Sequence, residues 1–194
     1  MEIRPNVGTA LAACRANETW LESGGSHCEQ PSSSLSCSYT MSTENRILFL
    51  CTGNYYRSRY AEDFFNHRAT TEGLAWRAFS GGLAEHGSPD NIGPMSRFAL
   101  EALQLKAVLP AGAIRYPQPC SLADFDKAQF VVALNESEHR PMIERRFPEL
   151  GDRITYWDVD DVELAPPSEA LAMIDDLVEE LILTLRQSCA YRRR

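Results

Sequence analysis

The feature that most constrains the fold is a regular alternation of short apolar runs and longer amphipathic stretches, which begins at residue 45. A short continuous apolar run is expected of a strand buried on both faces, and apolar positions at helical spacing indicate a helix that packs by one side. Strands are predicted over residues 47–50, 76–79, 130–134 and 154–157, and helices over 58–69, 94–104, 137–147 and 167–186. This order predicts an α/β fold, a three-layer doubly wound sandwich with a four-stranded parallel sheet and helices on both faces.

The first 44 residues lack this alternation. They are rich in Ser, Gly, Asn, Thr and Glu, and the run Ser32-Ser33-Ser34-Leu35-Ser36 is low in complexity. Such a composition buries too little apolar surface to offset the entropy lost on ordering. We therefore predict a disordered N-terminal extension over residues 1–44 and one folded domain over residues 45–190 of the 194-residue chain. We also hypothesise that the native product starts at Met41.

The charge and the cysteine content exclude several classes of protein. A formal net charge of −8 argues against a nucleic-acid binder, which needs a basic face. No stretch approaches the run of about 18 apolar residues that predicts a membrane span. The six cysteines form no C-x-x-C pair, which indicates reduced thiols in the cytoplasm and no zinc site. The dispersed His27, His67, His86 and His139 are predicted to be surface residues, and nothing in the sequence specifies an oligomeric state.

The loop after the first predicted strand is the first place to look for chemistry, because parallel sheets bind ligands at the carboxyl ends of their strands. It reads Cys51-Thr52-Gly53-Asn54-Tyr55-Tyr56-Arg57-Ser58 and opens a predicted helix. The backbone N–H groups of the residues between Cys51 and Arg57 can curl into a nest at the helix N-terminus, which is a natural site for an anion. We expect phosphate to contact Thr52, Gly53, Asn54, Tyr55, Tyr56 and Ser58.

Three residues of this loop have a chemical reason to stand where they do. Gly53 is expected to supply a backbone conformation that a side chain would resist. The planar guanidinium of Arg57 can hold two phosphate oxygens at once. The same N–H groups and helix dipole stabilise a thiolate at Cys51, the attacking form of a nucleophilic cysteine, and Ser58 can donate a hydrogen bond to that sulfur.

Residues 46–62 resemble the opening of the low-molecular-weight protein tyrosine phosphatases, in which the phosphate loop follows the first strand of the domain. The resemblance extends over about residues 45–187. Residues 80–82 match the turn after the family's second strand, and residues 133–137 match the turn after its third. It implies hydrolysis of a phosphate monoester through a phospho-cysteine intermediate, with a phosphorylated protein or a small aryl phosphate as substrate and without a cofactor or metal.

The resemblance also implies a general acid in a late loop. In the family this residue is an Asp, usually followed by Pro and an aromatic residue, and the matching segment here is Trp157-Asp158-Val159-Asp160-Asp161-Val162. Asp161 is the best match, because an acidic residue often precedes the family's Asp. Such a carboxyl gives a proton to the leaving oxygen and then activates water. Asp160 and Asp158 are the other candidates.

Three positions depart from the family pattern. Tyr56 stands where many members have a second Cys, so a protective disulfide with the nucleophile is not expected. Arg59 replaces a common Pro. Val162 and Glu163 replace the Pro and the aromatic residue that help wall the phenol pocket, which puts the preference for phosphotyrosine in question. The tyrosines offered as a substitute wall are Tyr55, Tyr56 and Tyr60.

Two other functions remain open at this point. An arsenate reductase of the same fold would need further cysteines soon after the third strand, but that place holds Asn135, Glu136 and Ser137. Cys120 lies before the strand and is interpreted as an ordinary free thiol. The second alternative is a catalytically weak module that binds phosphorylated partners, with Arg57 kept and the acid lost.

Overall fold

The computed structural model describes residues 45–86, 91–111 and 114–191. The extension predicted over residues 1–44 lies outside the described residues. The elements are β1 Asn45–Cys51, α1 Arg57–Thr71, β2 Trp76–Gly82, α2 Arg97–Leu105, α3 Leu122–Lys127, β3 Phe130–Ala133, α4 Glu136–Arg146, the 3₁₀ helix η2 Pro148–Arg153, β4 Ile154–Tyr156 and α5 Pro167–Tyr191. Strands and helices therefore alternate as the sequence pattern predicts.

The four strands form one parallel sheet in the order β2-β1-β3-β4. The first strand is central, so the carboxyl end of β1 has a neighbouring strand on each side. Cys51 pairs with Gly82 of β2, and Leu50 pairs with Ala133 of β3. The loop after β1 consequently opens between the ends of two other strands, which is where a doubly wound sheet binds ligands.

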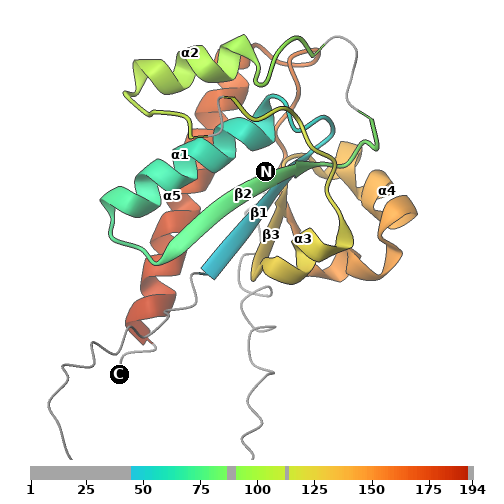
Figure 1. Cartoon of the computed structure of the whole chain (residues 1–194). Helices are drawn as coiled ribbons and strands as arrows, with labels where there is room; N and C mark the ends of the chain where they lie inside the picture. The colour runs from blue at the N-terminus through green and yellow to red at the C-terminus, as the bar shows by residue number, and fades with distance from the viewer. Residues whose placement is uncertain (1–44, 87–90, 112–113, 192–194) are drawn as a thin grey trace, which may run out of the picture.

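The two faces of the sheet carry separate cores because successive strand residues point to opposite sides. Ile47 and Phe49 of β1 pack in a cluster with α1, α2 and α5. Leu48 and Leu50 pack in a second cluster with α3, α4 and the start of η2. This arrangement confirms the predicted three-layer α/β fold with helices on both faces (Figure 1).

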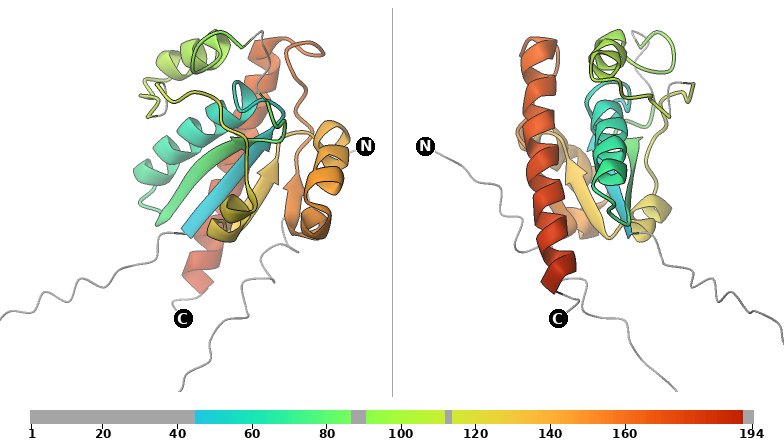
Figure 2. Two further views of the ribbon diagram at one scale, coloured as in Figure 1. Left: turned by 45° about the vertical axis from the view of Figure 1, so that its right-hand side comes forward. Right: turned by 90° about the vertical axis from the view of Figure 1, so that its left-hand side faces the viewer.

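The longest helix, α5, runs the length of the molecule in both views of Figure 2. It begins at Pro167, a residue that is well tolerated in the first turn of a helix. Helical spacing predicts inward positions at Leu171, Ile174, Leu177, Val178, Leu181, Ile182 and Leu185, and all of these are buried except Leu177, which is partly buried. Burial of each large aliphatic side chain stabilises the fold by about 1.5–3 kcal/mol. Over the ranges described, no helix is both long and apolar enough to cross a membrane.

The structure differs from the predicted elements in two places that bear on the site. The second strand does not end at residue 79 but continues through Ser80, Gly81 and Gly82, so these residues are sheet and not a turn. The short helix α3 was not predicted. It begins with a capping box, in which Ser121 and Asp124 satisfy each other's exposed backbone N–H groups. A helix of six residues shows too little periodicity to be recognised in the sequence.

Candidate active site

The segment from Cys51 to Ser58, which we call the phosphate loop, connects the end of β1 directly to the first turn of α1. Cys51 is 2% exposed and Arg57 is 1% exposed. The helix has no side-chain cap at Tyr56 and no acidic residue in its first turn. Its first backbone N–H groups are therefore available to an anion, and no negatively charged side chain of the first turn competes with that anion.

A buried asparagine holds the phosphate loop in shape. The backbone of Asn54 is left-handed, with φ of 49°. Its side-chain Nδ2 donates to Ser58 Oγ at 3.1 Å and to Ser80 Oγ at 2.8 Å, and its Oδ1 accepts from the backbone N–H of Gln118 at 3.1 Å. The expectation for Gly53 is wrong in this respect, because the left-handed position is Asn54. Asparagine tolerates this conformation better than most residues.

The Asn54 contacts decide which atom donates between Cys51 and Ser58. Cys51 Sγ lies 3.0 Å from Ser58 Oγ. The two hydrogens of the Asn54 amide go to Ser58 and Ser80, so Ser58 Oγ accepts on that side. The single hydroxyl hydrogen of Ser58 is then left for the sulfur of Cys51. The loop therefore presents a donor to this sulfur, which suits a thiolate.

The hydrogen-bond network continues below the loop and includes Glu62 and Arg115, which the sequence analysis did not identify. Ser80 Oγ donates to Glu62 Oε2 at 2.5 Å, and Arg115 Nη2 donates to the same carboxylate at 2.5 Å. Arg59, which replaces the family's common Pro, is fully buried and donates from Nη1 to the backbone oxygen of Arg115 at 2.9 Å. Burial and the neighbouring Arg115 lower the pKa of the Arg59 guanidinium. The loop thus rests on a set of charged side chains.

Glycines at the end of β2 allow this close approach. A Cβ on Gly82 would lie 3.2 Å from the backbone oxygen of Thr52 and 3.3 Å from Asn54. A Cβ on Gly81 would lie only 2.8 Å from the Cβ of Cys120. The Gly81-Gly82 pair is therefore a packing requirement, since any side chain would push β2 away from the loop or from Cys120.

Arg57 is surrounded by acceptors on the side that faces the cleft. Its Nη1 donates to the backbone oxygen of Val159 at 3.0 Å, and its Nη2 lies 2.6 Å from Asp161 Oδ2 and 2.8 Å from Glu138 Oε2. The Nε atom is buried and has no hydrogen-bond partner among the residues described. Burial alone would lower the pKa of this guanidinium, but the negative groups around it, Cys51 first among them, raise it above its ordinary value.

Glu138 is a site residue that the sequence analysis did not identify. It lies in the first turn of α4, and its Oε1 accepts a hydrogen bond from Thr52 Oγ1 while its Oε2 pairs with Arg57. Burial would raise the pKa of its carboxyl, but contacts with His139, Thr52 and Arg57 outweigh burial and lower the pKa to about 2. The signal in the sequence was its place just after the third strand, at the same edge of the sheet as Cys51.

The prediction that His139 is a surface residue is wrong, because this side chain is fully buried. Its Nδ1 accepts the backbone N–H of Asn135 at 3.0 Å, and its Nε2 lies 3.6 Å from Glu138 Oε2. An accepting Nδ1 carries no proton, so the neutral ring has its proton on Nε2, facing the carboxylate. Burial lowers the pKa of His139 further below its ordinary value.

The three candidate acids lie in one segment, residues 157–165, which we call the acid loop. Asp161 reaches Arg57, and its Oδ1 accepts the backbone N–H of Val162 at 2.7 Å. Asp160 is exposed and accepts from Asn135 Nδ2 at 3.3 Å. Asp158 is also exposed, and its backbone forms a β-bridge with Asn135. Of the three, only Asp161 has a side-chain contact with the phosphate loop among the described residues.

The two loops enclose a cleft of about 560 Å³. It is lined by Tyr55 and Tyr56 on one side and by Val162 and Leu164 of the acid loop on the other. Tyr60 is not part of this wall, because it is buried in the core and donates to Asp175 Oδ1 at 2.7 Å. Polar lining comes from the phosphate loop and from Asn91, Ser96, Asn135, Ser137, Glu138, Asp161 and Glu163.

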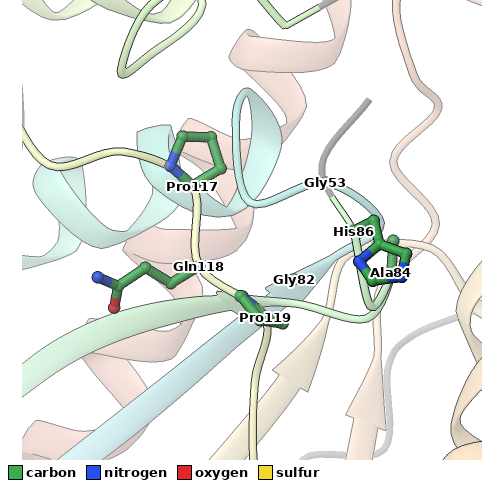
Figure 3. A pocket seen from close by; sticks show the side chains of 7 residues that line it. All are labelled: Gly53, Gly82, Ala84, His86, Pro117, Gln118 and Pro119. Carbon is green, nitrogen blue, oxygen red and sulfur yellow. The ribbon is translucent and has the colours of Figure 1, made fainter. Parts of the chain in front are cut away.

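A second hollow lies beside the phosphate loop (Figure 3). It is lined by Gly53, by Gly82 at the end of β2, and by the segment Pro117–Pro119. Its volume is about 20 Å³, which is room for roughly one water molecule. Figure 3 shows the side chain of Gln118 pointing away from the other lining residues, with His86 on the opposite side. This hollow is too small for a substrate, so the cleft is the candidate active site.

Two further expectations of the sequence analysis concern a metal site and the role of Cys120. In the described ranges, no group of three or more His, Cys, Asp or Glu side chains is placed to hold a metal ion. Cys120 is buried and free, and burial raises the pKa of its thiol to about 11. A thiol of that kind is a poor nucleophile, which does not favour the relay of cysteines that arsenate reduction requires.

Comparisons with known proteins agree with this geometry. Residues 46–187 match the model of the family described as low molecular weight phosphotyrosine protein phosphatase. A low-molecular-weight protein tyrosine phosphatase from T. tengcongensis is 27% identical, with 72% of this chain and 99% of that chain covered and a TM-score of 0.61. The YwlE arginine phosphatase from Geobacillus stearothermophilus is 26% identical, with 74% and 94% covered and a TM-score of 0.59.

A third structure is similar in fold. The low-molecular-weight phosphotyrosine phosphatase VcLMWPTP-2 from Vibrio cholerae O395 is 19% identical, with 74% of this chain and 98% of that chain covered and a TM-score of 0.63. A comparison with curated protein sequences gave no match.

Proposed function

This chain belongs to the low-molecular-weight phosphotyrosine protein phosphatase family, and we propose that it hydrolyses phosphate monoesters with Cys51 as nucleophile, Arg57 as phosphate anchor and Asp161 as general acid. The observation that carries the proposal is the arrangement of the phosphate loop. A cysteine with a serine donor on its sulfur and a buried arginine lie at an uncapped helix N-terminus, and Asp161 reaches in from the facing loop.

Substrate phosphate binds in the phosphate loop. The backbone N–H groups of the loop and of the first turn of α1 surround it, from Thr52, Gly53, Asn54, Tyr55 and Tyr56 to Ser58. The free Nε of Arg57 and the adjacent Nη2 form a planar fork that matches two phosphate oxygens. An ester bound in this way has its phosphorus above the sulfur of Cys51.

The first chemical step transfers the phosphoryl group to the enzyme. The thiolate of Cys51 attacks phosphorus, and a bond from sulfur to phosphorus forms as the bond to the leaving oxygen breaks. A bound phosphate places negative charge close to Asp161, and a like charge favours the protonated carboxyl. Asp161 then donates its proton to the leaving oxygen.

The second step returns the enzyme to its starting state. Asp161, now a carboxylate, accepts a proton from a water molecule whose oxygen attacks phosphorus. The bond between sulfur and phosphorus breaks, inorganic phosphate leaves, and the thiolate of Cys51 is regenerated. The hydrogen bond from Ser58 Oγ stabilises this thiolate as a leaving group.

We expect phosphorylated tyrosine in proteins and small aryl phosphates to be the substrates. The walls of the cleft support this substrate class. Tyr55, Tyr56 and Phe98 offer aromatic surface beside the phosphate loop, and Val162 and Leu164 offer apolar surface from the acid loop. An aryl leaving group would pack between them. We also retain the cytoplasm as the expected compartment, because the chemistry requires a free thiol at Cys51.

A second substrate class, phosphorylated guanidinium groups, is favoured by one observation. Three carboxylates line the cleft, from Glu138, Asp161 and Glu163, and a cationic leaving group would be attracted to them. One of the similar structures, which is 26% identical to this chain, is an arginine phosphatase. The ratio of kcat/KM for phosphoarginine and phosphotyrosine in the same peptide decides between the two classes.

The decisive test of the proposal is turnover of para-nitrophenyl phosphate, with and without a chelator. We expect hydrolysis that chelator does not abolish, because the thiolate and Arg57 supply the nucleophile and the charge stabilisation. The full chain should also release one phosphate per ester hydrolysed. Binding of phosphate without turnover would instead identify a phosphate-binding module, and restoration of activity by a divalent ion after chelation would contradict the mechanism.

A further inference from the structure

The carboxylate of Glu138 lies between the two ends of the phosphate loop. One oxygen accepts the hydroxyl hydrogen of Thr52, the residue directly after the nucleophile. The other lies 2.8 Å from Nη2 of Arg57, the residue that closes the loop. A single anion of this chain therefore bridges the start and the end of the loop that surrounds a phosphate.

The contacts of Arg57 show what an incoming phosphate has to replace. Nη2 has two hydrogens, and it is in contact with two carboxylates, Glu138 and Asp161. The buried Nε is the one donor nitrogen of this side chain without a partner among the residues described. A phosphate held by the planar edge of Nε and Nη2 needs one Nη2 hydrogen, so it must take that hydrogen from a carboxylate.

Glu138 is the carboxylate that stands in the place of the phosphate. It is the one of the two that also bonds to Thr52, whereas Asp161 approaches from the facing loop and bonds to its own neighbour Val162. Glu138 is also placed firmly, since its backbone N–H donates to the N-cap side chain of Asn135 at 3.0 Å. The neutral ring of His139 faces its second oxygen.

We propose that Glu138 is an internal carboxylate ligand of the phosphate loop, which substrate phosphate displaces from Arg57 and Thr52, and that its negative charge limits the affinity of the site for phosphate. The inference rests on the proposed function only in that the phosphate loop is taken as the phosphate site. It makes Glu138 a determinant of KM and of inhibition by the product, inorganic phosphate.

The balance of charge gives the direction of the effect. In the free protein, Arg57 faces two carboxylates. A phosphate dianion adds two negative charges beside them, and like charges a few ångströms apart repel strongly in a partly buried site. Removal of the charge at Glu138, with its shape retained, should therefore strengthen the binding of phosphate.

The test compares Glu138→Gln and Glu138→Ala with a matched control, Glu136→Gln, in the full chain. Glu136 lies in the same first turn of α4 and loses the same charge, but it is exposed and pairs with Arg140. The dissociation constant of inorganic phosphate is measured by titration calorimetry at pH 7. A second measurement is the extent to which bound phosphate protects Cys51 from an alkylating reagent.

We expect both Glu138 variants to bind phosphate about tenfold more tightly than wild type, by removal of one nearby like charge. The Glu136→Gln control should stay within about twofold, since the Glu136 carboxylate is exposed, paired with Arg140 and outside the cleft lining. Unchanged or weaker binding in Glu138→Gln and in Glu138→Ala would overturn the inference, because Glu138 would then merely hold Thr52 and Arg57 in position.

The outcome is separable from that of the proposed function. A chain that hydrolyses no phosphate ester, but binds phosphate more tightly in both Glu138 variants, keeps this inference and loses the proposed function. A chain that hydrolyses aryl phosphates with the same KM and the same phosphate affinity in all four proteins keeps the function and loses the inference. If neither wild type nor the Glu138 variants bind phosphate, both are wrong.

Discussion

The phosphate loop and the acid loop face each other across the cleft, yet they are built in opposite ways. Cys51, Asn54, Arg57 and Ser58 are each at most 2% exposed, and their contacts reach β2 and the segment before α3. Across the cleft, the side chain of Asp161 is 37% exposed. The phosphate loop is therefore held in shape by buried contacts, whereas the acid loop that faces it is open to solvent.

This difference has a local physical origin. The phosphate loop lies between a central strand and a buried helix, so its polar groups must find partners inside the protein. The acid loop connects an edge strand to α5. Its own turn satisfies part of its backbone, with the N–H groups of Leu164 and Ala165 both donating to the oxygen of Asp161. Variation in substrate preference is therefore easiest to accommodate in the acid loop.

The largest effect should come from the nucleophile in the preformed loop. Cys51→Ser is expected to lower kcat by about 10⁴-fold or more, as is usual when a nucleophile is removed. A serine hydroxyl is not ionised in this loop, so no phospho-enzyme forms, but inorganic phosphate should still bind. Rates with para-nitrophenyl phosphate and phosphate titration measure the two properties. Near-normal turnover in this variant would exclude the proposed mechanism.

The acid loop should show an effect that depends on the leaving group. Asp161→Asn is expected to slow phenyl phosphate hydrolysis by about 10²- to 10⁴-fold, the usual range for general acid catalysis. Para-nitrophenyl phosphate should lose less, since its leaving group is already stable as an anion. Asp160→Asn is the control and should change either rate little, because Asp160 bonds to Asn135 and not to Arg57. If Asp160→Asn gives the leaving-group dependence, the assignment is off by one residue.

A third prediction tests whether the phosphate loop is held by Asn54. Asn54→Ala leaves three polar partners without their bond and keeps a left-handed backbone, so we expect a loss of about 3 kcal/mol of stability. The rate should fall too, because Ser58 loses its orientation. Unfolding in urea and kcat are the measurements.

Asn66→Ala is the matched control for Asn54. Asn66 also bonds to the backbone of β2. Its Oδ1 accepts from the N–H of Ala78 at 2.8 Å, and its Nδ2 donates to the carbonyl oxygen of Ala78 at 3.0 Å. It lies on α1 outside the cleft-lining set. We expect this variant to lose stability and to keep kcat in the folded protein. Equal losses of kcat in both variants would mean that the rate reports general stability and not the shape of the loop.

A smaller effect is expected from pH. The pKa of Glu138 is lowered to about 2 in the folded protein, from an ordinary value of 4.5. The stabilisation is therefore fully present above about pH 4.5 and is lost as pH falls toward 2. Because the carboxylate is partly exposed, we expect only about 1–2 kcal/mol of this loss. Wild type should lose that much more stability than Glu138→Gln between pH 6 and pH 3, and parallel curves would contradict the lowered pKa.

The smallest effect is predicted for the segment outside both loops. Deletion of residues 1–40 should leave kcat and KM for para-nitrophenyl phosphate unchanged, because their composition predicts no part of the core. A truncated protein that aggregates, or one with a lower rate, would show that these residues contribute to the folded domain.

Much of the phosphate loop could be predicted from its sequence because its chemistry is local. Cys51 and Arg57 lie in one short segment between a strand and a helix, so their spacing alone indicates an anion site with a nucleophile. The left-handed residue was assigned wrongly to Gly53, because asparagine and glycine both adopt that conformation and the sequence does not rank them. The extension of β2 through Ser80 was missed for a related reason, since glycines usually indicate the end of a strand.

The order of strands and helices, the two apolar faces of the sheet and the choice of residues 51–58 as the candidate anion site can be predicted from local sequence, because each depends on residues close together in the chain. Which carboxylates face that loop depends on the packing of distant segments. Thr52 and Glu138 are 86 residues apart, and Arg57 and Asp161 are 104 apart. Such pairs meet only because the carboxyl ends of parallel strands lie at one edge of the sheet, and the burial of His139 and the donor role of Ser58 follow from the same packing.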